Sequence, residues 1–426
     1  MVNAKDENGS TPLIWACLNR RKDVVEMLMK TGADINLVDF TGNSPLQNAL
    51  DSGNVEIAEI LISKGANVYL GSSLHSACRK GYRHIVELII NKGVDINKRD
   101  NRGRTPLLIA CSHQQEDLVS FLLDNSCDIN HSDKMGDTPL SAACRSGSKV
   151  LVQKLLSNGA KVNKATANGW TALMSACNLG YKTITDLLIQ HGAKINCTTN
   201  NGWTPLMFAC GSGSSSLVLS LIKKGADMFK VTSHGWSALF MACEEGHDDI
   251  VTLLLRKNSN ANLSDRKGLT PLILACRTGN FRLCYRLIDN RAIINLSTKD
   301  AFYPIMAACE YGYISIMNAL IDQGANVEVT NNEGWTPLMF GCQYGHIHIV
   351  RKLISESVKI NTANNRGQTA LMIACKYLQK NTIVLLICYG ADINKVDKEG
   401  SIALSIARET AYKPIIDILI DHGANK

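Results

Sequence analysis

A short motif recurs at a fixed interval of 33 residues along almost the whole of this 426-residue chain. Its clearest form is Thr11-Pro12-Leu13, a hydroxyl residue followed by proline and leucine. Further clear copies start at Ser44, Thr105, Thr138, Thr204, Thr270 and Thr336. Weaker copies start at Ser72, Thr171, Ser237, Tyr303, Thr369 and Ile402, which makes thirteen in all. Self-similarity at this period indicates a repeat architecture, in which each copy is one supersecondary unit.

Each copy of the motif predicts a pair of short helices. A glycine usually stands two residues before the start, as Gly334 does, and permits the positive φ of a tight turn. The hydroxyl residue suits a helix N-cap, and proline fits the first helical position. Leucine and an alanine three residues later share one helix face, and the small alanine lets a second helix approach closely. The aliphatic segment that follows, such as residues 85–90, has the spacing of that second helix.

Thirteen copies in register make this chain resemble the ankyrin repeat family, whose 33-residue unit carries Thr-Pro-Leu-His-x-Ala. The resemblance covers residues 6–426, although only His75 occupies the histidine position of the motif. It implies an all-α solenoid of stacked antiparallel helix pairs with projecting β-hairpin fingers. We therefore expect residues 1–426 to form a single array of about 13 repeats, each kept folded by its neighbours.

One interval is shorter than the rest. The step from Ser44 to Ser72 is 28 residues, and the helical patterns on both sides are complete. The missing residues fall near 69–72, so we predict a shortened hairpin between the second and third repeats.

The 15 cysteines do not predict a metal or redox site. Eleven of them share one position, six residues after the repeat start, where the family commonly has a second alanine. A buried cysteine there behaves as a small hydrophobe, and no Cys-x-x-Cys pair exists to hold zinc. No apolar leader or long apolar stretch is present, so we expect reduced thiols and no membrane insertion. The expected location is the cytoplasm, with the nucleus as the alternative.

The sequence offers no catalytic residues, no cofactor-binding residues and no metal ligands. Neither His-Glu-x-x-His, a phosphate-binding Gly-x-x-x-x-Gly-Lys-Ser/Thr nor Gly-x-Ser-x-Gly occurs. The serine- and glycine-rich run at 211–216 lies in the turn between two predicted helices, so the repeat explains it. We expect a protein that is not an enzyme.

Aromatic residues make up only 6% of the chain, and several recur in register. A tryptophan row directly precedes the repeat start at the base of the predicted fingers, and consists of Trp170, Trp203, Trp236, Phe302 and Trp335. A tyrosine row lies eight residues after the start, near the end of the first helix, and consists of Tyr311, Tyr344 and Tyr377. By resemblance to the family, both positions face the groove used for contact. Two interpretations of the rows carry equal weight. Either the repeats duplicated together with their aromatic residues, or the aromatic residues are hot spots for binding a partner.

The resemblance implies protein recognition by the concave surface and the fingers, in a scaffold or adaptor that is not an enzyme. We expect one or more protein partners and a monomeric chain without a cofactor. An alternative is nucleic-acid association, because residues 131–230 contain 11 Lys/Arg and only 4 Asp/Glu. A substrate adaptor for a ubiquitin ligase, using the same basic section and the aromatic rows, is a further alternative. The net charge of +7 over the whole chain argues against nucleic acid as the main partner.

Overall fold

The computed structural model describes residues 2–425, and within them the chain forms 26 helices and no sheet. The helices fall into two units, Met1–Asn200 and Asn201–Lys426, and each is described by itself. The helices of unit 1 are α1 (Pro12–Leu18), α2 (Lys22–Lys30), α3 (Pro45–Asp51), α4 (Val55–Ser63), α5 (Ser73–Lys80), α6 (Arg83–Asn91), α7 (Pro106–Ser112), α8 (Glu116–Asp124), α9 (Pro139–Ser146), α10 (Lys149–Ser157), α11 (Ala172–Asn178) and α12 (Lys182–Gln190).

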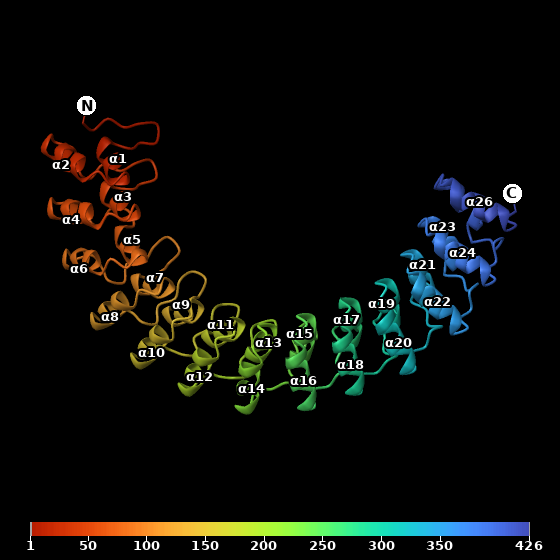
Figure 1. Ribbon diagram of the computed structural model, residues 1–426. Coiled ribbons are helices and arrows are strands. Elements are labelled where there is room, and N and C mark those ends of the chain that lie inside the picture. Colours follow the sequence, from red (N-terminus) through yellow and green to blue (C-terminus); the bar gives the residue numbers. More distant parts are fainter. Residues whose placement is uncertain (1, 426) are drawn as a thin grey trace. The chain divides into compact units, whose positions relative to one another are not determined.

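The helices of unit 2 are α13 (Pro205–Gly211), α14 (Ser215–Lys223), α15 (Ala238–Glu244), α16 (Asp248–Arg256), α17 (Pro271–Thr278), α18 (Phe281–Asp289), α19 (Pro304–Glu310), α20 (Ile314–Asp322), α21 (Pro337–Gln343), α22 (Ile347–Ser355), α23 (Ala370–Lys376), α24 (Lys380–Cys388), α25 (Ala403–Glu409) and α26 (Lys413–Asp421). Odd-numbered helices are the first of each pair, here called inner helices, and even-numbered helices are outer helices. Within each unit, successive inner helices pack against each other and each also packs against its own outer helix (Figure 1).

The repeat motif starts the inner helices as the sequence predicts. The Thr336 hydroxyl accepts a hydrogen bond from the backbone N–H of Met339 at 3.3 Å, and Pro337 occupies the first helical position of α21. The same cap opens most inner helices, but Ser72, Tyr303 and Ile402 make no side-chain cap bond. An N-cap bond of this kind stabilises a helix by about 1 kcal/mol.

Leucine and alanine of the motif build the core between repeats. Leu206 and Ala209 of α13 are buried, and Leu239 and Ala242 occupy the same positions in α15. These helices have only seven residues each, too short to persist alone in water, so packing against neighbours keeps them folded.

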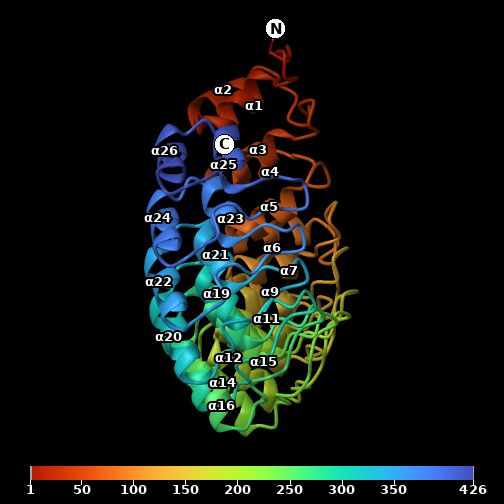
Figure 2. The same cartoon turned by 90° about the vertical axis from the view of Figure 1, so that its right-hand side faces the viewer.

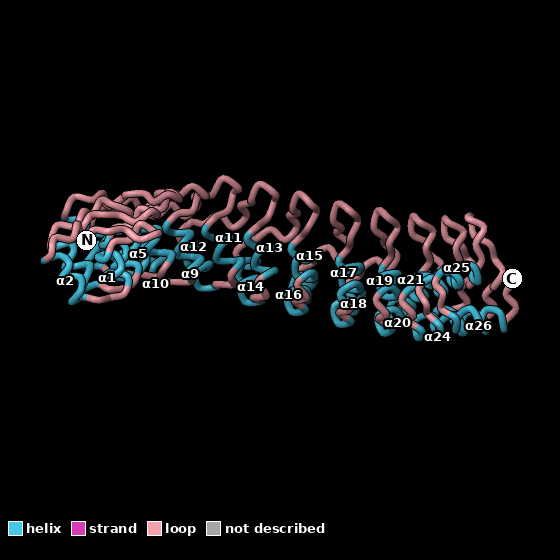
Figure 3. The backbone as a smooth tube through the Cα atoms, turned by 90° about the horizontal axis from the view of Figure 1, so that it is seen from above, coloured by secondary structure: helices cyan, strands magenta, loops and turns pink. Residues whose placement is uncertain are grey.

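The connections between repeats form a row of hairpin fingers beside the inner helices. Full-length fingers close by backbone hydrogen bonds across their turns, and most neighbouring fingers join at their tips. The N–H of Asn332 donates to the Asp300 carbonyl at 3.1 Å, and the N–H of Asn365 donates to the Glu333 carbonyl at 2.9 Å. In each unit the fingers lie together on one side of the helices (Figures 2 and 3).

An asparagine at the end of most repeats ties that repeat to the next. The Asn295 side chain accepts from the Asn326 N–H at 2.9 Å and donates to the Gly324 carbonyl at 3.0 Å. Asn361 makes the same two bonds to Asp392 and Gly390. These side chains satisfy the polar backbone of the outer connections, where no regular ladder does so.

The connection from α4 to α5 is shorter than the other connections between successive repeats. Helix α4 ends at Ser63 and α5 begins at Ser73, whereas α6 ends at Asn91 and α7 begins at Pro106. Both helices flanking the short connection are complete. None of the helices in residues 2–425 combines the length and the apolar character needed to cross a membrane.

Candidate inner-face recognition site

The tryptophan row closes the bases of the fingers, where the sequence placed it. The N–H of Thr166 donates to the Trp170 carbonyl at 2.9 Å in unit 1, and Thr232 bonds Trp236 in the same way in unit 2. Trp170 is half-buried, and its indole N–H donates to the Ser175 hydroxyl at 2.8 Å. The ring of Trp170 is therefore held against the inner helix of its own repeat.

In unit 2 the tryptophan row packs on phenylalanines from the inner helices. The rings of Trp203 and Trp236 meet edge to face with centroids 5.9 Å apart. Trp203 stacks on Phe208 at 5.3 Å, and Trp236 stacks on Phe240 at 5.4 Å. Offset and edge-to-face pairs of this kind contribute about 0.5–1.5 kcal/mol beyond the burial of their area.

A second aromatic cluster surrounds Phe340 of α21. The Trp335 ring lies 5.3 Å from it, and the Phe302 ring meets it edge to face at 5.7 Å. Phe208, Phe240 and Phe340 are functional-site candidates that the repeat pattern alone did not indicate. The signal was present, because Trp-Thr-Pro-Leu-Met-Phe occurs in identical form at 203–208 and at 335–340.

The tyrosine row caps the C-terminal ends of three successive inner helices, α19, α21 and α23. Tyr311, Tyr344 and Tyr377 are 42%, 48% and 43% exposed. The pKa of the Tyr344 phenol is raised, first by partial burial and then by the charges of Glu310, Tyr311 and Tyr377. Because α19, α21 and α23 pack successively against one another, the three phenols form one row.

Residues at the start of the outer helices hold the tyrosines in place. The Tyr313 ring stacks on Tyr311, and the His346 ring stacks on Tyr344 with centroids 6.0 Å apart. His346 also donates from Nε2 to the Glu310 carbonyl of the preceding repeat at 3.0 Å. Gly312, at φ +77°, leaves space for this ring, because a Cβ there would lie 2.7 Å from it. Tyr311 and Tyr344 are thus held by stacking within their own repeats, and His346 is itself anchored to the preceding repeat.

Two grooves lie between the tryptophan and tyrosine rows of unit 2. The larger, here called the Trp236 groove, has a volume of about 610 Å³. It is lined by His234, Trp236, Phe240, Glu244, Asp265, Arg266, Lys267, Leu269, Leu274, Arg277, Thr278 and Tyr311. The smaller, here called the Trp335 groove, has a volume of about 160 Å³ and is lined by Glu333, Trp335, Arg366, Gln368, Ile373, Lys376 and Tyr377.

Charges of both signs alternate along the ends of the inner helices. Glu244 and Arg277 line the Trp236 groove, and Lys376 lines the Trp335 groove. Partial burial raises the pKa of the Glu310 carboxyl, and the Arg277 guanidinium opposes that rise. Mixed charges beside aromatic rings suit a peptide or protein surface better than a uniformly charged polymer.

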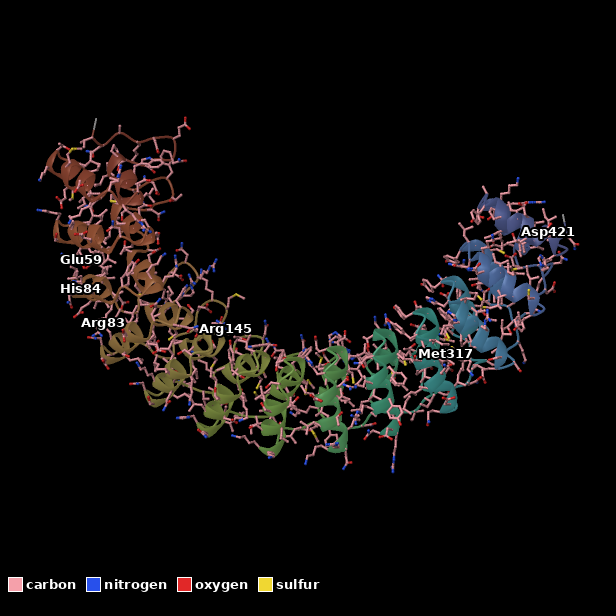
Figure 4. The ribbon with its side chains drawn as sticks, in the orientation of Figure 1. Glu59, Arg83, His84, Arg145, Met317 and Asp421 are labelled. Atoms are coloured by element: carbon pink, nitrogen blue, oxygen red, sulfur yellow. The ribbon has the colours of Figure 1, made fainter. Side chains whose placement is uncertain are left out.

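Unit 1 has a groove on the corresponding face, with a volume of about 530 Å³. Two of its arginines are paired: Arg145 of α9, labelled in Figure 4, bonds both carboxylate oxygens of Asp137, and Arg104 bonds Asp100. Because only Met135 adds a strongly exposed apolar side chain and no aromatic residue lines it, this groove offers fewer aromatic anchors than unit 2.

The repeated cysteines are core residues. All eleven are buried thiols, and the part of the chain that the structure describes contains no cluster of three or more potential metal ligands. The sulfurs of Cys276 and Cys284 lie 3.8 Å apart, as two hydrogen-bonded thiols rather than a disulfide. Burial raises the pKa of Cys17, Cys177 and Cys375 to about 12, so these thiols stay protonated near neutral pH.

The family model for ankyrin repeats, a unit of three copies, matches the chain from end to end. The matched segments are residues 1–71, 74–166, 150–232, 213–300, 279–364, 305–397 and 343–426. The chain belongs to the ankyrin repeat family. The predicted family and the predicted solenoid of helix pairs are thereby confirmed.

Curated relatives share segments of this ankyrin array with the chain. A Caenorhabditis elegans homologue of transient receptor potential cation channel subfamily A member 1 is 35% identical over 113 residues, which is 26% of this chain and 9% of that protein. The mouse B-cell lymphoma 3 protein homologue is 33% identical over 119 residues, 26% of this chain and 27% of that protein. Human ankyrin repeat and KH domain-containing protein 1 is 32% identical over 108 residues, 24% of this chain and 4% of that protein.

The matches therefore span less than a third of each of these relatives. Proteins with such different names share the repeat rather than one activity. Ankyrin repeats are in general modules for protein–protein interaction and are in general not catalytic.

Proposed function

We propose that this chain is a non-enzymatic protein-recognition scaffold or adaptor whose partner binds across the inner face of unit 2. The observation that carries the proposal is the tyrosine row, three half-exposed phenols held beside two grooves. Tyrosine and tryptophan are enriched among the residues that dominate binding energies at protein interfaces. Repeats that stack in one row offer such residues at regular intervals along an extended surface.

Nucleic acid is a weaker candidate than protein. Several lysines of the basic section 131–230 bind their own chain: Lys164 donates to the Asn130 carbonyl, and Lys182 pairs with Asp186 at 2.7 Å. Lys154 donates to the Ser120 hydroxyl at 2.6 Å. The abundance of buried thiols favours a reducing, cytoplasmic location for the protein recognition that we propose.

The first test measures how a natural partner responds to loss of the tyrosine row. A partner captured on the immobilised chain is purified and titrated against the Tyr311→Ala/Tyr344→Ala variant by calorimetry. Removal of two hot-spot residues should weaken binding by about 30-fold or more, corresponding to ~2 kcal/mol.

The matched control is Tyr285→Ala. Tyr285 is 59% exposed on outer helix α18, away from both grooves, so its removal should leave the affinity unchanged. Circular dichroism checks that all variants are folded. Full affinity in the folded double variant would show that the partner binds elsewhere.

A further inference from the structure

We propose that the segment bound by unit 2 is proline-rich and adopts a polyproline II helix along the tyrosine row. This inference rests on the function proposed above for the same face and specifies the chemistry of the bound segment. Three features of the inner face point to it: the spacing of the tyrosine row, the hydrogen-bond donors of its aromatic side chains, and the backbone edges of the fingers, which are already paired with one another.

The spacing of the repeats matches the pitch of the proposed ligand. A polyproline II helix has three residues per turn and rises about 9.3 Å per turn. Packed helices lie about 8–10 Å apart, so successive inner helices place Tyr311, Tyr344 and Tyr377 at nearly the same interval. Every third residue of the ligand therefore meets the next tyrosine without a change of register.

Beside the charged residues of the grooves, the aromatic side chains offer hydrogen-bond donors without an acceptor of their own. Within residues 2–425 neither the indole N–H of Trp236 nor that of Trp335 has an acceptor, and the hydroxyls of the three tyrosines likewise make no hydrogen bond. A polyproline II backbone has no internal hydrogen bonds, and its prolines offer carbonyl acceptors but no N–H. Indole and phenol donors over aromatic rings are thus complementary to a proline-rich segment.

Other peptide conformations fit this face less well. A β-strand would need a free backbone edge, but the finger tips already bond to one another, as Lys299 does to the Lys267 carbonyl at 2.8 Å. An amphipathic helix would need a continuous apolar trough, whereas Glu244 and Arg277 interrupt the Trp236 groove. In a polyproline II ligand, the residues between the prolines can carry charges that meet these two side chains.

The length of the site follows from the two indoles. Trp236 and Trp335 are three repeats apart, a span of roughly 30 Å at the packing distance of helices. A polyproline II segment of about ten residues covers that span at about 3.1 Å per residue. A twelve-residue peptide is therefore a sufficient probe.

The test uses acetylated, amidated dodecaproline, with a twelve-residue Gly-Ser repeat peptide as the flexible control. Calorimetry on the full chain should show binding of dodecaproline and none of the Gly-Ser peptide. The Tyr344→Ala/Tyr377→Ala variant should bind dodecaproline at least about tenfold more weakly, while Tyr285→Ala should match the unaltered chain.

A second variant isolates the hydrogen bond. Trp335→Phe keeps an aromatic ring on Phe340 but removes the indole N–H, and should weaken binding by about fivefold. Unchanged binding in both folded variants, or absence of dodecaproline binding at ~1 mM protein and peptide, would overturn the proposal. The natural-partner titration at Tyr311 and Tyr344 does not depend on proline, so its success beside a failed dodecaproline titration would reject only the ligand conformation.

Discussion

Alkaline pH is expected to lower the free energy of unfolding of this chain more than any single surface substitution would. The cause is the buried thiols of the repeats, whose pKa values are raised by burial in the folded chain. They are Cys17, Cys78, Cys111, Cys144, Cys177, Cys243, Cys276, Cys309, Cys342 and Cys375. Five of them lie in each unit.

The sign of the effect follows from proton binding. Above the ordinary thiol pKa of about 8.5 the unfolded chain loses these protons, whereas the folded chain keeps them until the raised pKa is reached. The stabilising contribution is therefore complete below about pH 8 and is lost as pH rises through the raised values, to about 12 for Cys17. In this range each thiol lowers the free energy of unfolding by ~1.4 kcal/mol for each rise of one in pH. If unit 1 or unit 2 unfolds as a whole, its five thiols together lower that free energy by about 7 kcal/mol for the same rise in pH.

Urea unfolding followed by circular dichroism at pH 7.5, 8.5 and 9.5, in a reducing buffer, measures this loss. The midpoint should fall steeply above pH 8.5. The Cys309→Ala/Cys342→Ala/Cys375→Ala variant should flatten that fall, since alanine does not ionise. Cys388→Ala, at an exposed thiol, should not change it. A midpoint independent of pH over this range would contradict the assignment of these thiols to the core.

The second large effect is expected from Phe240→Ala. Phe240 is 1% exposed and is among the largest fully buried side chains, and its ring supports Trp236. Its removal leaves a cavity between α15 and its neighbours, and buried Phe→Ala substitutions cost about 3–5 kcal/mol. The free energy of unfolding, measured with urea at pH 7.5, should fall by that amount.

Phe229→Ala is the matched control. Phe229 is 59% exposed in the connection after α14, so its removal should change the free energy of unfolding by about 0.5 kcal/mol or less. Equal losses for the two variants would contradict the packing described for the tryptophan row. If the free energy of unfolding falls only for Phe240→Ala, the tryptophan row contributes to stability through its contact with Phe240 as well as facing the groove.

The sequence predicts the position of each residue within its repeat well, because caps and helix starts depend on near neighbours. Thr336 as N-cap and Tyr344 at the helix end are examples. Contacts between repeats depend on which side chains two separate copies bring together, and periodicity does not report that. The bonds of Asn295 to the next repeat were therefore missed. The stacking of Trp236 on Phe240 lies within one repeat and was missed because a spacing of four residues does not report which rings stack. Recurrence of one hexapeptide at 203–208 and 335–340 was the available clue to the aromatic clusters.

The central claim is that the inner face of unit 2 meets the partner, and photocrosslinking tests it most directly. Benzoylphenylalanine replaces Tyr344 in one form of the chain and Tyr285 in another, and each is irradiated in an extract of the cells that produce the protein. We expect the form altered at position 344 to crosslink a discrete partner that the form altered at position 285 does not. Crosslinking of the same partner only from position 285 would contradict the claim, because it would place the partner on the outer helices.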